Sequence, residues 1–499
     1  MMGHEDHQGK LFCYNVNLEK RLRSDHPLRK INEFVDFDFI YGEVQEKYGS
    51  RGNVSVPPPV ILKMLLLLVF YNVRSERELM ATIPERLDWL WFLGYNLDDT
   101  IPNHSVLSKA RARWGVEIFE SFFNRIVWQC VEAGIVDGSK LFMDSSLITA
   151  DASNNSVVDS TSLDRYLHSG YQELEKRLDE QSSKRQQKHG IANRKYISTA
   201  DPDASVVLSG SKSRLRYKVH RGVDEQSEII TAVGVTPGEI NEAHCLPSLV
   251  DQHEANTGLE VETVVTDSKY GTVENFLACH DKEVQAHIPD LKETQRGRRK
   301  DIFPEDAFRY DPDTDTYTCP AGKSLFLRKH RKKRKAYEYS CSKKVWRSCS
   351  LRDQCTKSKT GRTIKRHHRH EELELMRSRA QMKQAKKDIR TRQHLMERSF
   401  ARACRYGFKR SRWRRLWRNQ IQEYLTAAIQ NIMVLLARNE KSKDAMALAM
   451  MEIKQQIKRN NADNIRILPS KWIDTIFAAL QKTLFYRNLT KLQLKGTLW

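Results

Sequence analysis

The sequence predicts a mixed α/β protein in which an all-helical N-terminal part precedes an α/β core, and three observations lead to this. Before about residue 135, apolar residues recur at spacings of three and four, the period of an amphipathic helix. From about Lys140 the pattern changes to short β-branched runs separated by helix-length segments. Two of these runs lead into an aspartate, Asp144 and Asp267, the kind of residue that carries chemistry at a strand end.

Length and composition narrow the class of protein. A chain of 499 residues is long enough for two to four domains with cores of their own. The most apolar run, Val60–Tyr71, contains Lys63 and is too short to span a bilayer. Residues 1–30 are polar and charged, so we expect a flexible leader and no secretory signal. The nine cysteines of such an intracellular chain indicate free thiols or metal ligands instead of a disulfide framework.

Positive charge is concentrated in one part of the chain. The formal net charge is +21, and residues 321–370 hold 18 Lys and Arg against only Glu338 and Asp353. Residues 401–420 add basic groups and no acid. Such clustering predicts a polyanionic partner such as double-stranded DNA. The alternative is a solvated, disordered basic segment, although the interleaved Trp, Tyr and Cys residues speak against it.

The N-terminal part reads as a set of helices, the last of which follow a proline turn. Ile101–Ser105 precedes a basic stretch, Lys109–Arg113, and together they predict a short-turn helix pair that reads DNA. An ordinary small helical bundle explains the pattern equally well. The helices are predicted over Pro59–Phe70, Glu78–Ile83, Leu87–Leu93, His104–Trp114 and Val116–Ala133.

The α/β part has a specific order of elements. The first strand is Leu141–Asp144, with a continuation through Leu147–Ala150 left open; a hairpin follows, and two further strands each come after a helix. The charged segment Tyr166–Gly190 is expected to be an exposed excursion. This order is that of a ribonuclease-H-like fold, in which the first and fourth strands lie side by side and would bring Asp144 next to Asp267. The elements after the first strand are Leu215–His220, Glu228–Val235, Asn241–His253, Val261–Thr266, Val273–His280 and Val284–Ile288.

A third carboxylate, Glu397, lies on an arginine-rich helix predicted over Gln393–Tyr406. Asp144, Asp267 and Glu397 on one sheet edge would form a site for two Mg²⁺ or Mn²⁺ ions, because carboxylates are the hard oxygen ligands these ions prefer. Two such ions activate the attacking hydroxyl and stabilise the leaving oxygen in phosphoryl transfer. The alternative for Asp267 alone is that it caps the next helix.

Four segments carry a resemblance to a known family. Met143–Ser153, Thr266–Asn275, Met396–Ala401 and Tyr424–Ile432 resemble the DDE transposases of bacterial insertion sequences. The N-terminal helical part and Tyr317–Gly322 resemble a subgroup with a cysteine-bearing insertion. The resemblance covers roughly residues 30 to 440.

The resemblance implies a function and a set of site residues. Asp144, Asp267 and Glu397 fall on the three metal-binding carboxylates of the family, which implies that this enzyme binds the terminal inverted repeats of a transposable element. It would then cleave the DNA and transfer the strands into a target, which is DNA transposition by recombination. We further expect a homo-oligomer on DNA, a cytoplasmic, nucleoid-associated location and no membrane partner. DNA contacts are predicted for Lys269, Arg398, Arg402, Arg405, Lys409 and Arg412.

Two positions depart from the family pattern. Ser145-Ser146 stands where Gly-Thr usually follows the first aspartate, and Cys404 stands where the wider group often has a lysine. Residues seven apart share a helix face, so Cys404 is expected on the side of Glu397. The alternative is a cysteine buried with Phe400 and Phe408.

The basic segment also holds a group of cysteines. Cys319, Cys341, Cys349 and Cys355 are candidate ligands of a structural Zn²⁺, with His330 as a substitute ligand. The spacing lacks the close pair typical of zinc sites, so independent free thiols are the alternative.

In the next basic stretch we assign Trp417 to the core and leave Trp413 open as a group that stacks near DNA.

Beside the transposase assignment, two alternatives stay open: a domesticated, inactive DNA-binding protein and a related metal-dependent nuclease. The predicted domains are a leader (1–30), a helical DNA-binding domain (31–135), a ribonuclease-H-like core split into 138–290 and 385–438, a basic insertion (291–384) and C-terminal helices (439–499).

Overall fold

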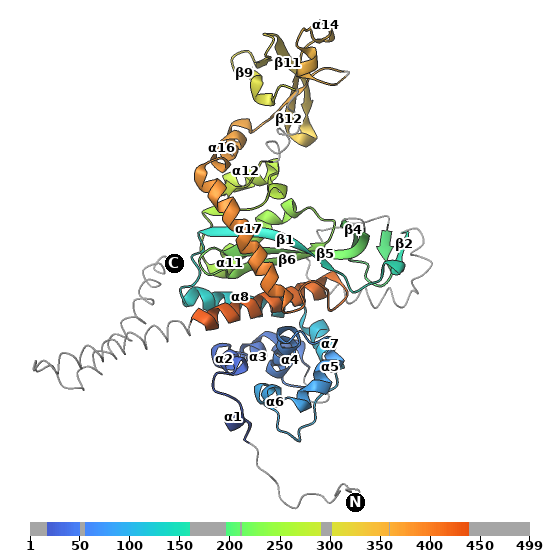
Figure 1. The fold of residues 1–499 in the computed structure, drawn as a ribbon, viewed down its shortest axis with the longest axis vertical. Coiled ribbons are helices and arrows are strands. Elements are labelled where there is room, and N and C mark those ends of the chain that lie inside the picture. Colours follow the sequence, from blue (N-terminus) through green and yellow to red (C-terminus); the bar gives the residue numbers. More distant parts are fainter. Residues whose placement is uncertain are drawn as a thin grey trace, which may run out of the picture. The chain divides into compact units, whose positions relative to one another are not determined.

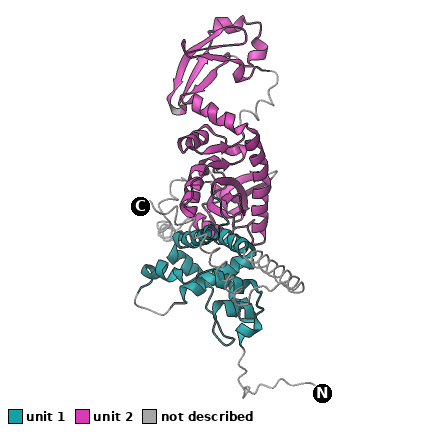
Figure 2. Cartoon of the chain, turned by 90° about the vertical axis from the view of Figure 1, so that its left-hand side faces the viewer, with its two compact units in different colours: residues 1–137, 425–499 teal, residues 138–424 magenta. Residues whose placement is uncertain are grey.

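The computed structural model describes residues 17–49, 55–159, 196–209, 212–290, 302–358 and 360–438. The predicted excursion and the predicted C-terminal helices lie outside the described residues. The chain divides into two compact units, one of residues 1–137 and 425–499 and one of residues 138–424 (Figure 2). None of the helices in the described ranges is both long and apolar enough to cross a bilayer.

The first unit is helical, as predicted. Helix α4 (Pro58–Phe70) is buried along almost its whole length and supplies the centre of the unit's core. On helix α7 (Ser105–Trp114) Arg111 is buried against Glu76, and the Arg113 guanidinium lies 4.5 Å from the Tyr48 ring. Two cations of the basic helix therefore serve internal contacts. The other helices are α1 (Leu18–Arg21), α2 (Pro27–Phe34), α3 (Phe39–Val44), α5 (Glu76–Thr82), α6 (Leu87–Leu93) and α8 (Val116–Glu132).

The second unit contains a mixed sheet built around strand β1 (Lys140–Thr149). Strand β5 (Lys212–Asp224) pairs with β1 antiparallel along its length, and β7 (Thr263–Val265) pairs with the other edge of β1 in parallel. The sequence order of three antiparallel and two parallel strands is confirmed. Around these three strands, β4 (Ser205–Ser209) and β6 (Ile230–Pro237) both pair with β5, and β8 (Gln285–His287) extends the sheet beside β7.

Helices cover both faces of this sheet (Figure 1). Leu141 and Met143 of β1 share one apolar cluster with residues of α11 (Leu246–Thr257), α12 (Val273–Asp281) and α16 (His370–Ala380). Because side chains alternate along a strand, Asp144 points to the opposite face, where α17 (Lys383–Cys404) crosses the strands. The helix α17 begins ten residues before the predicted start.

A buried ion pair fastens α17 to the sheet. The Arg221 side chain of β5 is fully buried, and its Nε donates to Glu423 Oε1 at 2.6 Å. Its Nη1 also donates to the Ser399 carbonyl and hydroxyl oxygens at 3.2 Å each. The guanidinium packs against the rings of Phe400 and Phe408 at 5.0 and 4.9 Å. One cation thereby joins β5, α17 and the helix of residues 416–438, where Trp417 is buried as predicted.

Between β8 and α16 the chain forms a second, antiparallel sheet (Figure 1). The sequence indicated a basic insertion here but no strands, because β11 (Ser324–Arg331) buries only Leu325 and shows no apolar alternation. Two short helices, α14 (Lys343–Arg347) and α15 (Arg352–Cys355), precede the last strand. The remaining strands are β9 (Arg309–Asp311), β10 (Thr316–Thr318), β12 (Ala336–Ser340) and β13 (Ile364–His367).

A buried carboxyl makes the stability of the fold depend on pH. Asp201 Oδ1 accepts from the Tyr217 hydroxyl at 2.6 Å and from the Arg415 N–H at 3.0 Å, whereas Oδ2 has no hydrogen-bond partner among the described residues. Burial raises the pKa of Asp201 to about 6. The folded chain therefore keeps a proton on this group at pH values where the unfolded chain has released it.

We predict that the free energy of unfolding falls as pH rises from about 4 to about 6, by up to ~3 kcal/mol from this group. Asp201→Asn cannot titrate, so its stability relative to the wild type should rise across the same interval. Urea unfolding of both proteins at several pH values measures the difference. A constant difference would contradict the assignment.

Candidate active site

Asp144 lies in the middle of β1 on the face covered by α17. Its Oδ1 accepts from the Ser145 N–H at 2.7 Å, and its Oδ2 receives Arg392 Nη1 at 2.6 Å. The Asp144 side chain is 27% exposed and that of Arg392 11%. This carboxylate is thus accessible from solvent and paired with a largely buried cation.

Asp267 lies just beyond the end of β7 and caps the 3-10 helix η6 (Ser268–Tyr270), since its Oδ1 accepts from the Lys269 N–H at 3.1 Å. Burial raises the pKa of Asp267, and the Asp144 carboxylate raises that pKa further, while Arg392 lowers it. The two aspartates are therefore close enough to repel each other. The predicted alternative, in which Asp267 caps the helix that begins at Val273, is wrong, because Thr272 caps that helix and Asp267 caps only η6.

Two buried groups complete the surroundings of this pair. The Tyr270 hydroxyl is fully buried and has no hydrogen-bond partner among the described residues. Burial raises the pKa of Tyr270 well above its usual value, and Asp144 and Asp267 are among the acids that add to the effect. Burial would also raise the pKa of Glu242, but Lys218 and Lys269 at 2.9 and 3.2 Å outweigh burial and lower it.

These residues fit a divalent cation by the chemistry of their donors. Asp144 and Asp267 supply hard oxygen ligands, and their repulsion would be relieved by a positive ion between or beside them.

No hydrogen bond or ion pair joins Glu397 to either aspartate among the described residues. Glu397 is exposed, and its Oε1 accepts from Gln393 Nε2 at 3.2 Å. Helical geometry accounts for this: Arg392 faces Asp144, and a residue five positions later lies about 140° further around the helix. The role of Glu397 as a third ligand stays a prediction.

Cys404 ends α17 and is exposed, and its thiol donates to the Phe400 carbonyl oxygen at 3.4 Å. The alternative in which this cysteine is buried with Phe400 and Phe408 is therefore wrong. Those two rings pack on each other, at 5.4 Å, without it. The reason is the helix turn at Ala403–Arg405, which directs the last side chain of α17 outward while Ala403 is buried.

The basic residues predicted to contact DNA differ in their surroundings. Arg398 and Arg402 both pair with Glu228, while Arg405 and Lys409 are exposed. Lys269 is 65% exposed and pairs with Glu242.

Arg412 is different, because burial lowers its pKa and its Nη2 donates to the Tyr406 carbonyl oxygen at 3.2 Å. Its guanidinium therefore also has an internal, structural contact.

The sequence reasoning missed Arg392, the cation that holds Asp144. The sequence does contain a pattern that could have indicated Arg392. This arginine follows Asp388 by four residues, so the two side chains share one face of the helix. Asp388 is buried and accepts from His287 Nδ1 at 2.8 Å, at the neighbouring end of the sheet. A buried acid followed one turn later by an arginine indicates which side of an otherwise polar helix faces the sheet.

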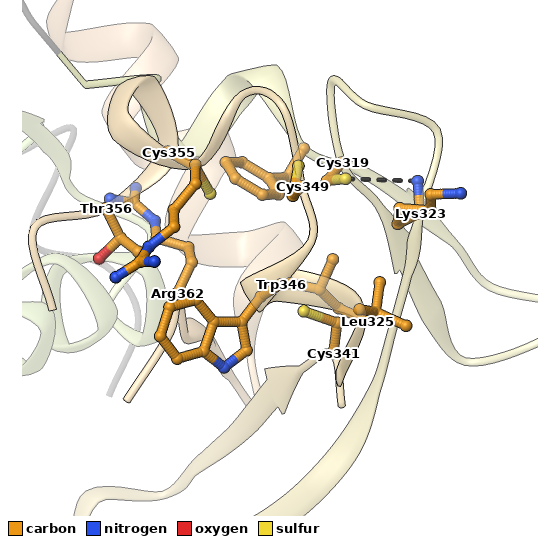
Figure 3. A pocket seen from close by; sticks show the side chains of 12 residues that line it. Cys319, Lys323, Leu325, Cys341, Trp346, Cys349, Cys355, Thr356 and Arg362 are labelled. Carbon is orange, nitrogen blue, oxygen red and sulfur yellow. Dashed lines mark hydrogen bonds between the residues drawn. The ribbon is translucent and has the colours of Figure 1, made fainter. Parts of the chain in front are cut away.

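The four predicted zinc ligands lie around one small cavity of the second sheet (Figure 3). His330 is not among the residues that line it, and its Nε2 instead lies 2.8 Å from His368 Nε2. Burial raises the pKa of Cys341 and of Cys355, and the other thiols of the group raise both further.

Comparisons with known proteins identify two parts of the chain. Residues 16–113 match the family model described as Transposase domain (DUF772), and residues 318–436 match the model described as Transposase DDE domain. The second match contains Glu397 and the four cysteines, whereas Asp144 and Asp267 lie between the two matches. A search of curated proteins found no match.

One similar solved structure is the cryo-EM structure of a piggyBac transposase synaptic complex with hairpin DNA. The identity is 11%, 90% of this chain and 84% of that chain are covered, and the TM-score is 0.33, too low to define a common fold. DDE transposase domains generally use divalent metal ions. On its two family matches, the chain is a DDE transposase, an enzyme that acts on DNA.

Proposed function

We propose that this transposase binds the inverted repeats at the ends of an insertion sequence, cleaves the DNA there and joins the ends to a target. The observation that carries the proposal is the proximity of Asp144 and Asp267, which come from neighbouring strands and repel each other. Mutual repulsion of two half-buried acids costs stability, and such an arrangement is typical of sites that bind cations.

The strand order supports a ribonuclease-H-like core. Three antiparallel strands, β1, β5 and β6, adjoin two parallel ones, β7 and β8, with helices on both faces. The first and fourth strands of this order, β1 and β7, are neighbours. The aspartates on them therefore meet by backbone pairing alone, without any contribution from a distant loop.

Asp144 and Asp267 would hold two divalent ions, Mg²⁺ or Mn²⁺, which activate the nucleophile and stabilise the leaving oxygen. The protein's own groups prepare this site. The Lys269 N–H fixes one oxygen of Asp267, the Ser145 N–H fixes one of Asp144, and Arg392 neutralises Asp144 when no ion is bound. Glu397 would be the third ligand, and its exposed carboxylate, bonded to Gln393, would have to turn to the pair to serve as one.

The basic insertion would hold the DNA backbone. Strand β11 and the turn after it present exposed cations such as Lys329 and Lys332 beside the exposed Phe326. Strands with many cations and few buried residues suit contacts to phosphates, which carry affinity without sequence information.

We predict that Asp144→Asn and Asp267→Asn each abolish cleavage and strand transfer while binding to element ends stays within about twofold. The exchange removes a ligand charge and keeps the hydrogen bonds to the neighbouring N–H groups. Cleavage of labelled element ends and a gel-shift assay measure the two activities.

Glu260→Gln changes an exposed acid outside the site and serves as the control. Glu397→Gln tests the third ligand separately: full activity in this variant would remove Glu397 from the site. Full activity in both aspartate variants would refute the proposed function.

Arg392 competes with a cation for Asp144, so Arg392→Gln should alter the response to metal. We predict that Mn²⁺ raises the melting temperature of Arg392→Gln more than that of the wild type, because no ion pair has to break. Thermal unfolding with Mn²⁺ and with chelator measures the effect. Arg390→Gln, an exposed position on the same helix, should respond as the wild type does; an equal response of all three proteins would contradict the competition.

DNA affinity should depend on salt through the insertion. The double variant Lys329→Gln/Lys332→Gln should flatten the slope of log K against log salt by about 1.8, at roughly 0.9 for each phosphate that a lysine no longer neutralises. Lys282→Gln is the control, because Lys282 already pairs with Asp251 and Glu254. An unchanged slope in the double variant would show that these lysines do not bind phosphates.

A further inference from the structure

The four cysteines of the insertion come from separate elements and surround one cavity. Cys319 lies in the turn between β10 and β11, Cys341 directly after β12, Cys349 between α14 and α15, and Cys355 at the end of α15. All four line a cavity of about 40 Å³, together with apolar and aromatic side chains and with Lys323, Arg352, Thr356 and Arg362 (Figure 3). This volume is enough for an ion or a water molecule and too small for an organic ligand.

The turn that holds Cys319 has a geometry suited to a metal-bound thiolate. The Lys323 N–H donates to Cys319 Sγ at 3.3 Å, and the Gly322 N–H donates to the Cys319 carbonyl oxygen at 2.8 Å. Gly322 has φ +69°, a conformation that side chains rarely adopt and that lets the chain fold back over the sulfur. An N–H group directed at the sulfur is the kind of outer hydrogen bond that orients a metal ligand.

The insertion lacks the apolar core that a sheet of this size would need on its own. Among its described residues, the cluster of buried side chains holds only five members: Phe308, Tyr317, Leu325, Tyr339 and Ile364. Helices α14 and α15 add a single buried residue, Trp346. Small domains with so little buried surface generally require a disulfide or a metal to fold.

A disulfide is not the solution adopted here. All four thiols are free, and any one disulfide between them would join at most two of the three segments. A single ion bound by all four would join the β10–β11 turn, the end of β12 and the two helices at once. Four thiolates around one small cavity are the ligand set that a tetrahedral structural Zn²⁺ takes.

We propose that Cys319, Cys341, Cys349 and Cys355 bind one structural Zn²⁺ that holds helices α14 and α15 onto the basic sheet. In the structure no three of these four sulfur atoms lie within 4.8 Å of one another, so the thiols would have to turn towards the ion to bind it; the described group of donors that does meet this distance is His280, Asp281 and Glu372. This site is separate from the two aspartates and stands whether or not the chain is active on DNA.

The group of His280, Asp281 and Glu372 is explained without a metal. Arg369 donates to both Asp281 and Glu372, and its guanidinium lowers the pKa of Asp281 to about 2. A cation thus already occupies the position between these acids, and the cluster joins the end of α12 to the start of α16.

Zinc content of the full-length protein, purified without chelator or affinity metal, tests the proposal directly. We expect about one Zn²⁺ per chain, and after exchange with Co²⁺ the intense visible absorption of a tetrahedral thiolate site. Cys341→Ser and Cys355→Ser should lower the zinc content by at least about tenfold at the same protein concentration. Cys341→His should restore much of it, because imidazole is also a zinc ligand.

Two further measurements distinguish loss of the zinc site from a general failure of the variants to fold. Cys404→Ser, at an exposed cysteine outside the insertion, should keep the zinc of the wild type. A chelator added to the wild type should open residues 302–367 to protease while the rest of the described chain stays resistant. Absence of zinc together with absence of a Co²⁺–thiolate band in the wild type would overturn the proposal, as would zinc retained in both serine variants.

Discussion

The parallel pairing of β1 with β7 is the constraint on which the candidate site depends. Phe142 pairs with Val265, the last residue of β7, so Asp144 and Asp267, each two residues further along the chain, follow at the same level of the sheet. The pairing relies on backbone hydrogen bonds and on a shared apolar cluster that includes Leu141 and Val264. Two acids are thus held close together by groups that do not themselves carry charge, and the repulsion between them is offset by the stability of the core.

Helix α17 is attached to this sheet by polar contacts as much as by apolar ones. Asp388 bonds His287, Arg392 bonds Asp144, and the Ser399 oxygens receive Arg221. Hydrogen bonds and ion pairs are directional and each depends on a single partner group, unlike apolar packing. A helix held in this way is suited to shift when a cation or a phosphate replaces one of its partners.

The insertion solves a different physical problem. Its strands are rich in cations that must remain exposed in order to meet DNA, and such strands leave little apolar surface to bury. A metal that ties four thiols would replace the missing hydrophobic stabilisation without covering the cations. The sheet is anchored to the core by Arg369, which bonds Asp281 at the end of α12.

The order and type of most elements could be read from the sequence, because their apolar periods are strong. The helices of the first unit, the strands around Asp144 and Asp267 and the pairing of the two aspartates could all be predicted, since strand order implies adjacency in this fold. The strands of the insertion could not, because exposed basic residues conceal the alternation of β11. Three facts became apparent only in the folded chain: Arg392 forms an ion pair with Asp144, Glu397 is exposed to solvent, and Cys404 is exposed. These facts depend on the rotation of α17 about its axis, and that rotation is set by contacts with residues such as Arg221 and His287 that are more than a hundred positions away in the chain.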